Sequence, residues 1–163
     1  MRNARFRGRF EIKMDPKGRI SLPSAFRAGV GERRPRLVVT NSRYQDKSCL
    51  HAYASSDWLA LEARVALLPA LKPEVQAFQR FYLSGGQEVE IDGQGRILVP
   101  QSLRKFASLE ETATLVGLGD KFEIWPTPAW TDVHRSLSSS FEDTLLAIAR
   151  LDARGAASPP EPT

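Results

Sequence analysis

The chain contains one sequence pattern twice, and this internal repeat restricts the folds open to it more than any other feature. When the chain is shifted against itself by 77 positions, residues 14–27 (MDPKGRISLPSAFR) align with residues 91–104 (IDGQGRILVPQSLR), and six of the fourteen aligned positions are identical. Two unrelated segments of average composition would share about one. Farther along, residues 50–53 (LHAY) align with residues 122–125 (FEIW) at an offset of 72, so the first copy has five additional residues.

Each copy has the same predicted order of elements. A short strand enters a turn that contains Asp and Gly, a second strand leaves it, and a proline, Pro23 or Pro100, ends that strand before a short helix. A β-hairpin and amphipathic helices follow, with a loop predicted at residues 41–48 of the first hairpin and a weak point at the serines of 138–140 in the last helical stretch. The chain is therefore predicted to be mainly β with peripheral helices, an α+β fold. The predicted boundaries are residues 5–68 for the first domain, 82–137 for the second, 138–152 for a C-terminal helix and 153–163 for a disordered tail.

The composition is that of a globular protein able to bury a core: 163 residues, of which 42% are hydrophobic and 26% charged. The longest stretch without a charged residue, residues 48–56, is far shorter than the roughly 20 residues that cross a bilayer. The N-terminal arginines are not followed by an apolar segment, so no secretory signal is expected. A cytoplasmic location without membrane contact is the resulting prediction.

The charge is concentrated in the N-terminal part of the chain. Residues 1–36 hold 11 Lys and Arg against 3 Asp and Glu, a net charge of +8, whereas the remainder holds 12 against 16, a net charge of −4. A cationic segment of this kind suits a polyanion such as nucleic acid or an acidic partner protein, although a solvated basic surface would have the same composition.

The repeated identities concentrate in an Asp-x-x-Gly-Arg turn and the strand that leaves it. Four of them, Asp15, Gly18, Asp92 and Gly95, are explained as turn-forming residues, because Asp accepts backbone hydrogen bonds and Gly tolerates a positive φ. A turn does not require Arg19 or Arg96, so each arginine either pairs with the neighbouring aspartate or is presented to a ligand. Presentation to DNA is favoured, because a two-stranded ribbon fits the major groove and arginine is the commonest reader of guanine. The predicted DNA-binding residues are Arg7, Arg9, Lys13, Lys17, Arg19 and Arg96.

An enzyme is disfavoured, and no catalytic residue, metal site, cofactor or small-molecule substrate is predicted. Cys49, the only cysteine, and His51 lie two apart on a predicted strand and share a face, but no second histidine is near them in the sequence and His134 lies far along a predicted helix. A nucleophile needs a base and a third group that orients it, so packing is the favoured interpretation of the pair. No metal-ligand spacing and no Gly-rich phosphate motif are present.

Two apolar helical stripes are longer than one small core needs. They are predicted to form an interface between copies of the chain, with Trp58, Leu61, Trp130 and Val133 as the contact residues.

In these motifs the chain resembles the MraZ family of bacterial regulators, which are built from two SpoVT-AbrB domains. The segments that carry the resemblance are residues 6–8 (FRG), 15–23 (DPKGRISLP), 81–85 (FYLSG), 92–100 (DGQGRILVP), 115–117 (LVG) and 122–125 (FEIW). The resemblance implies a tandem AbrB-type swapped-hairpin barrel with a pseudo-twofold axis, and assembly into rings. It also implies that Asp15, Lys17, Arg19, Asp92 and Arg96 face double-stranded DNA.

The function that the resemblance implies is sequence-specific regulation of transcription, with repression as the expected direction. The target would be closely spaced direct repeats in the promoter of the division and cell wall gene cluster, and the protein would be nucleoid-associated in the cytoplasm. The alternative is an AbrB-type antitoxin or another protein-interaction module without a promoter target of its own.

Overall fold

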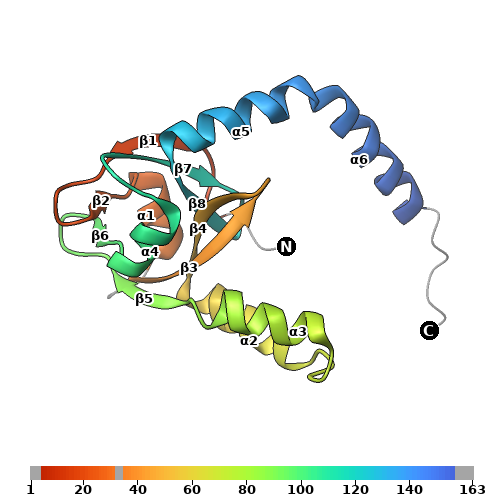
Figure 1. Cartoon of the computed structure of the whole chain (residues 1–163), viewed down its shortest axis with the longest axis horizontal. Helices are drawn as coiled ribbons and strands as arrows, with labels where there is room; N and C mark the ends of the chain where they lie inside the picture. Colours follow the sequence, from red (N-terminus) through yellow and green to blue (C-terminus); the bar gives the residue numbers. More distant parts are fainter. Residues whose placement is uncertain (1–4, 32–34, 157–163) are drawn as a thin grey trace. The chain divides into compact units, whose positions relative to one another are not determined.

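The computed structural model describes residues 5–31 and 35–156, and divides the chain into two compact units, one extending to Ala129 and one beginning at Trp130 (Figure 1). The strands, all in the first unit, are β1 (Arg9–Lys13), β2 (Arg19–Ser21), β3 (Arg36–Tyr44), β4 (Lys47–Ala54), β5 (Gln87–Glu90), β6 (Arg96–Leu98), β7 (Thr112–Gly117) and β8 (Lys121–Pro126). The helices wholly within this unit are α1 (Ser24–Val30), α2 (Ser55–Ala66), α3 (Pro73–Phe78), the π-helical segment η1 (Gln79–Leu83) and α4 (Gln101–Ala107).

The two copies exchange their first strands. Six strands form one antiparallel sheet in the order β1-β7-β8-β4-β3-β5. β1 belongs to the first copy but pairs with β7 of the second, and β5 belongs to the second copy but pairs with β3 of the first. When each strand is replaced by its counterpart in the other copy, the same order is obtained in reverse. A pseudo-twofold axis therefore passes between the central strands β4 and β8. The prediction of two related copies in a mainly β fold with helices is confirmed.

A separate two-stranded ribbon, formed by β2 and β6, covers one face of this sheet. Ile20 of β2 lies opposite Ile97 of β6, and both side chains are buried in the main core. The helices α1 and α4 follow the two ribbon strands and contribute Phe26 and Leu103 to the same core. Phe26 also contacts Phe122 of β8, with ring centroids 4.8 Å apart. Equivalent residues of the two copies therefore contribute to one shared core.

The strands do not close into the predicted barrel. β1 and β5 remain the edges of an open six-stranded sheet, and the ribbon meets the chain beyond β1 at an isolated bridge between Met14 and Ile20. Pro23 and Pro100 lie shortly after the two ribbon strands. Because proline cannot continue a strand ladder, the ribbon strands end early and are too short to pair along an edge of the sheet. The helices α1 and α4 close the core instead.

The loop predicted at residues 41–48 is wrong, because the strands of the first hairpin continue into it. β3 extends to Tyr44, β4 begins at Lys47, and only Gln45 and Asp46 connect them. Both connecting residues have a positive φ, 50° and 60°, as in the type I′ turn that fits the twist of a hairpin. Gln45 and Asp46 are not the Asn-Gly or Asp-Gly pair that usually marks this turn.

The second unit contains most of α5 (Thr127–Ser139) and α6 (Phe141–Ala156). Ser140 separates the two helices, at the serine run where a weak point is predicted. Residues 153–156, predicted as the start of the tail, are helical, and the rest of the predicted tail, residues 157–163, lies outside the described residues. Every helix within residues 5–31 and 35–156 is too short or too polar to span a lipid bilayer.

Candidate nucleic-acid interface

The two Asp-x-x-Gly-Arg motifs fold into the same hydrogen-bonded turn. In the first, the Oδ1 atom of Asp15 accepts hydrogen bonds from the backbone N–H groups of Lys17 (2.9 Å) and Arg19 (2.8 Å). In the second, the Oδ1 atom of Asp92 accepts the equivalent bonds, from Gln94 and from Arg96, both at 2.9 Å. In both copies the aspartate carboxylate therefore bonds the backbone of its own turn.

The ribbon holds the two turns side by side. The backbone N–H of Leu22 donates to the carbonyl of Gly95 (2.9 Å), and the N–H of Val99 donates to the carbonyl of Gly18 (3.0 Å). Each turn is therefore bonded to the strand end of the other copy, and the two loops lie on the same side of the first unit (Figure 1). Residues 77 positions apart in the sequence thus form one continuous surface.

The turn glycines explain two further identities of the repeat. Gly18 and Gly95 have φ values of 90° and 76°, which side chains with a Cβ rarely adopt. A Cβ on Gly18 would lie 2.4 Å from the guanidinium of Arg104, and a Cβ on Gly95 would lie 2.7 Å from the side chain of Arg27. Sequence reasoning left Arg27 and Arg104 without a role, although their identity in both copies was the signal. Each lies over the turn of the other copy.

Arg19 and Arg96 pair with the neighbouring aspartates, which was one of the two alternatives left open by the sequence. The Nε of Arg19 lies 2.6 Å from Oδ2 of Asp15, and the Nε of Arg96 lies 3.1 Å from Oδ2 of Asp92. Because the pairing uses Nε, the four N–H donors on the two Nη atoms of each guanidinium stay available to another acceptor. The arginine side chains are 32% and 28% exposed. The aspartate therefore orients each arginine without covering its outer edge.

The hydrogen bonds lower the pKa of both turn aspartates below the ordinary value of 3.8. The main cause is the backbone N–H of the arginine in each turn, with the guanidinium adding to it. A pKa that is depressed in the folded chain contributes stability above 3.8, and this contribution is lost as the pH falls through the folded value. The turns are thus fully bonded at neutral pH.

We expect a carboxyl ¹³C NMR titration to place the midpoints of Asp15 and Asp92 below 3.8. The variant Arg19→Ala should raise the midpoint of Asp15 only part of the way toward 3.8, because the hydrogen bonds from the backbone N–H groups remain. The midpoint of Asp92 serves as the internal control and should not change. Equal shifts of both aspartates would contradict a local effect of Arg19.

The remaining predicted DNA-binding residues lie along one exposed path. Lys17 is exposed at the tip of the first turn, where the second turn has the neutral Gln94. Arg9 and Lys13 lie on the exposed face of β1, about 13 Å apart at the usual rise of a strand, and Arg7 is exposed just before β1. The structure thus groups Lys17 with the two turns and places the other three along the edge strand that leads to them.

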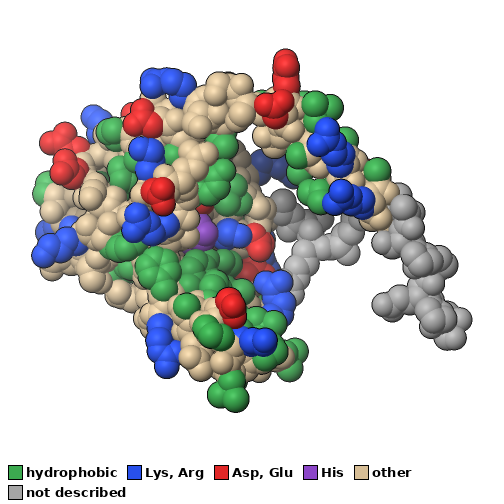
Figure 2. Space-filling model, turned by 45° about the vertical axis from the view of Figure 1, so that its right-hand side comes forward, with side chains coloured by type: hydrophobic (Ala, Val, Ile, Leu, Met, Phe, Trp, Pro, Cys, Tyr) green, Lys and Arg blue, Asp and Glu red, His purple; other side chains and the backbone are tan. Residues whose placement is uncertain are grey.

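Two of the four residues predicted for an oligomer interface are buried within the described chain. Trp58 is only 7% exposed, because its ring packs against Tyr53 and Tyr82 in a second cluster, and Val133 is 1% exposed. They therefore offer little surface to another molecule, whereas Leu61 and Trp130 are half-buried. The exposed apolar side chains in α2, just after it and in α6 are instead Leu59, Leu67, Leu68, Leu71, Phe141, Leu145, Leu146, Ile148 and Leu151. Hydrophobic side chains are visible over α2 and α3 in the space-filling view (Figure 2).

Comparison with known proteins identifies a family and a solved structure to which this chain is similar. The family model described as "MraZ protein, putative antitoxin-like" matches residues 5–81 and again residues 82–149. The solution structure of PHS018 from Pyrococcus horikoshii is similar over 73% of this chain and 87% of that chain, at 12% sequence identity and a TM-score of 0.35. The two family matches divide the chain into the same two copies as the internal repeat.

Proposed function

This chain belongs to the MraZ family, and on that premise we propose that it is a sequence-specific DNA-binding regulator of transcription that works without catalysis. The observation that supports this best is the pair of adjacent turns, in which Asp15 orients Arg19 and Asp92 orients Arg96. An arginine with free Nη donors matches the O6 and N7 acceptors of guanine in the major groove. Two such arginines on one short ribbon can read neighbouring base pairs.

The proposed target is a set of closely spaced direct repeats in the promoter of the division and cell wall gene cluster, with repression as the outcome. This assignment rests on the family, and with it we propose that the protein is associated with the nucleoid in the cytoplasm. DNase footprinting on the region upstream of the chain's own gene tests it directly. Regularly spaced protected segments are expected, and uniform or absent protection would contradict the proposal.

We expect binding to weaken steeply as the salt concentration rises. Residues 1–36 have a net charge of +8, and each phosphate contact made by a Lys or Arg releases condensed counterions from DNA. Several contacts per assembly would lower the affinity by roughly 10³-fold or more between 50 and 200 mM salt. Fluorescence anisotropy on a labelled promoter fragment measures this dependence. An affinity that stays constant over the same range would contradict phosphate contacts.

We also propose that several chains assemble into a ring. One ribbon covers few base pairs, whereas linked subunits on repeated sites gain roughly 10²- to 10⁴-fold in avidity through effective concentration. Leu59 and Leu67 are 64% and 86% exposed, so a neighbouring chain could cover them.

Light scattering at micromolar concentration should therefore show an oligomer, and the double variant Leu59→Ser with Leu67→Ser should give a smaller particle. Thermal unfolding of the variant serves as the fold control. A monomeric parent chain that still protects several adjacent repeats would contradict the assembly.

An antitoxin-like protein-interaction module is the second candidate, favoured by the wording of the family description. In vitro selection from a random DNA pool separates the two candidates. Enrichment of one sequence, lost with Arg19→Ala, supports the regulator. A pool without enrichment favours the interaction module.

A further inference from the structure

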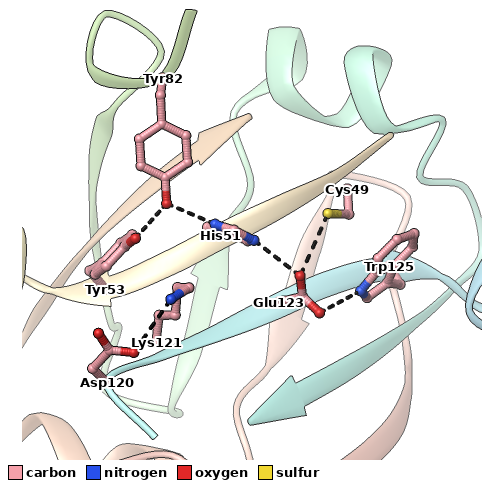
Figure 3. Close-up of polar contacts among 8 residues, drawn as sticks. All are labelled: Cys49, His51, Tyr53, Tyr82, Asp120, Lys121, Glu123 and Trp125. Carbon is pink, nitrogen blue, oxygen red and sulfur yellow. Dashed lines mark hydrogen bonds and ion pairs between the residues drawn. The ribbon is translucent and has the colours of Figure 1, made fainter. Parts of the chain in front are cut away.

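Three potential metal ligands converge on the face of the sheet opposite the main core (Figure 3). Cys49 and His51 project from β4, and Glu123 projects from β8, where its Cα lies opposite that of His51. The Oε2 atom of Glu123 is 3.0 Å from Nε2 of His51 and 4.0 Å from Sγ of Cys49. One donor atom from each of the three residues lies within 4.8 Å of the other two.

The pseudo-twofold axis explains why these residues meet. His51 and Glu123 occupy the same position in the two copies, because residues 50–53 align with residues 122–125. At this position, and not at its neighbours in the same two strands, the equivalent residues face each other across the axis, so identical residues here would place like groups together. The copies have instead diverged to an imidazole and a carboxylate, which are complementary ligands. This cluster therefore belongs to neither copy alone.

We propose that Cys49, His51 and Glu123 bind a zinc-class divalent transition-metal ion between the two copies. Thiolate sulfur, imidazole nitrogen and carboxylate oxygen are the three donor types that Zn²⁺ takes from proteins. Tetrahedral bonds of about 2.0 to 2.3 Å place ligand atoms about 3.3 to 3.7 Å apart. The separations of Glu123 Oε2 from His51 Nε2 and from Cys49 Sγ, 3.0 and 4.0 Å, lie on either side of that range. Small side-chain rotations would bring all three donors to one ion, and water would fill the fourth position.

Neighbouring residues hydrogen-bond two of the ligands through the atoms that would not bind the ion, as is usual around metal sites. The other ring nitrogen of His51, Nδ1, lies 2.7 Å from the hydroxyl of Tyr82, which is held by η1, and can donate to it when Nε2 binds the ion. The other oxygen of Glu123, Oε1, accepts a hydrogen bond from Nε1 of Trp125 at 3.0 Å. Tyr53 in turn bonds the hydroxyl of Tyr82. These contacts fix the orientation of His51 and Glu123.

Charge also balances at the site. The Cys49 thiol would lose its proton to solvent when the ion binds, and one thiolate together with one carboxylate neutralises a divalent cation. Cys49 is fully buried, and the side chains of His51 and Glu123 are only 13% and 12% exposed. A neutral assembly is the form that such a buried position favours.

Cobalt(II) titration of the metal-stripped full-length chain tests the proposal. Co²⁺ is a spectroscopic substitute for Zn²⁺, and a bound thiolate gives a charge-transfer band in the near ultraviolet. Because Cys49 is the only cysteine, this band reports on that residue alone. We expect the band to saturate at one Co²⁺ per chain and to disappear when Zn²⁺ is added. Its absence at saturating Co²⁺ would overturn the proposal, whatever the variants do.

Single variants then test each ligand. Cys49→Ser should lose the band, and His51→Gln and Glu123→Gln should each weaken binding at least tenfold. His134→Gln, which removes the only other histidine, is the matched control and should bind as the parent does. Circular dichroism checks the fold, and Zn²⁺ should raise the Tm of the parent but not of Cys49→Ser. Parent-like affinity in a folded His51→Gln variant would show that the ion binds elsewhere and would overturn the assignment.

Discussion

Replacing both Arg19 and Arg96 by alanine is expected to weaken promoter binding by roughly 30-fold to more than 10⁴-fold. A bidentate contact between arginine and guanine contributes about 1 to 3 kcal/mol, and the double variant removes two of them from each chain. Assembly into a ring would multiply the loss, because every linked subunit carries the same pair. Gel-shift titration on the promoter fragment, at one fixed salt concentration, measures the change.

The control for this experiment is the double variant Arg43→Ala with Arg80→Ala. It removes the same charge from the chain, but Arg43 donates to the carbonyl of Asp46 in the β3–β4 turn and Arg80 to the carbonyl of Gln76, so neither belongs to the motif turns. We expect it to weaken binding only slightly. Equal losses in the two double variants would mean that total charge, rather than the oriented arginines, determines affinity. In that case the turns do not read DNA sequence.

Replacing Phe122 by alanine is expected to lower the free energy of unfolding by about 3 to 5 kcal/mol, which corresponds to a fall in Tm of roughly 6 to 20 °C. Phe122 is fully buried, and its ring centroid lies 5.0 Å from that of Phe6 and 4.8 Å from that of Phe26. The cavity would therefore open where both copies contribute to the core. Urea unfolding followed by circular dichroism measures the change.

Phe141→Ala is the matched control, because it makes the same truncation at a side chain that is 56% exposed. We expect it to change the free energy of unfolding by no more than about 0.5 kcal/mol. If Phe122→Ala lowered the free energy of unfolding no more than Phe141→Ala does, a core shared by the two copies would be contradicted.

The elements of the fold were predictable where their signals are local. The two Asp-x-x-Gly turns and the helix after each proline follow from residues within one short window, and the repeat follows from comparing two such windows. The pairing of β1 with β7 does not, because no local pattern indicates which copy supplies the partner strand. The closed barrel came from the family resemblance. It fails because the prolines after β2 and β6 leave the ribbon too short to pair along an edge of the sheet.

The residues of the candidate sites were likewise predictable only where their signal was local. Arg19 and Arg96 could be selected from the sequence because a turn does not need a guanidinium. Only coordinates could show that the carboxylates of Asp15 and Asp92 bind the Nε atoms and leave the Nη donors to another acceptor. Glu123 was missed as a neighbour of Cys49 and His51 because it lies 72 residues from His51. The alignment of the two copies held the signal, since it places His51 and Glu123 at equivalent positions. This alignment predicts that His51 and Glu123 are neighbours only if the axis is known to pass between β4 and β8.

The exchanged first strands have a consequence for how this chain acquires its structure during synthesis. β1 leaves the ribosome early, but Thr112, the partner of Lys13, follows it by 99 residues. At about 5 to 20 residues per second, β1 remains without its partner strand for roughly 5 to 20 s. β3 likewise waits for β5, so the first copy emerges with β1 and the outer edge of β3 unpaired. On a polysome, neighbouring nascent chains expose the same unpaired edges at the same time, and pairing between chains competes with pairing within one chain until β7 and β8 have been made.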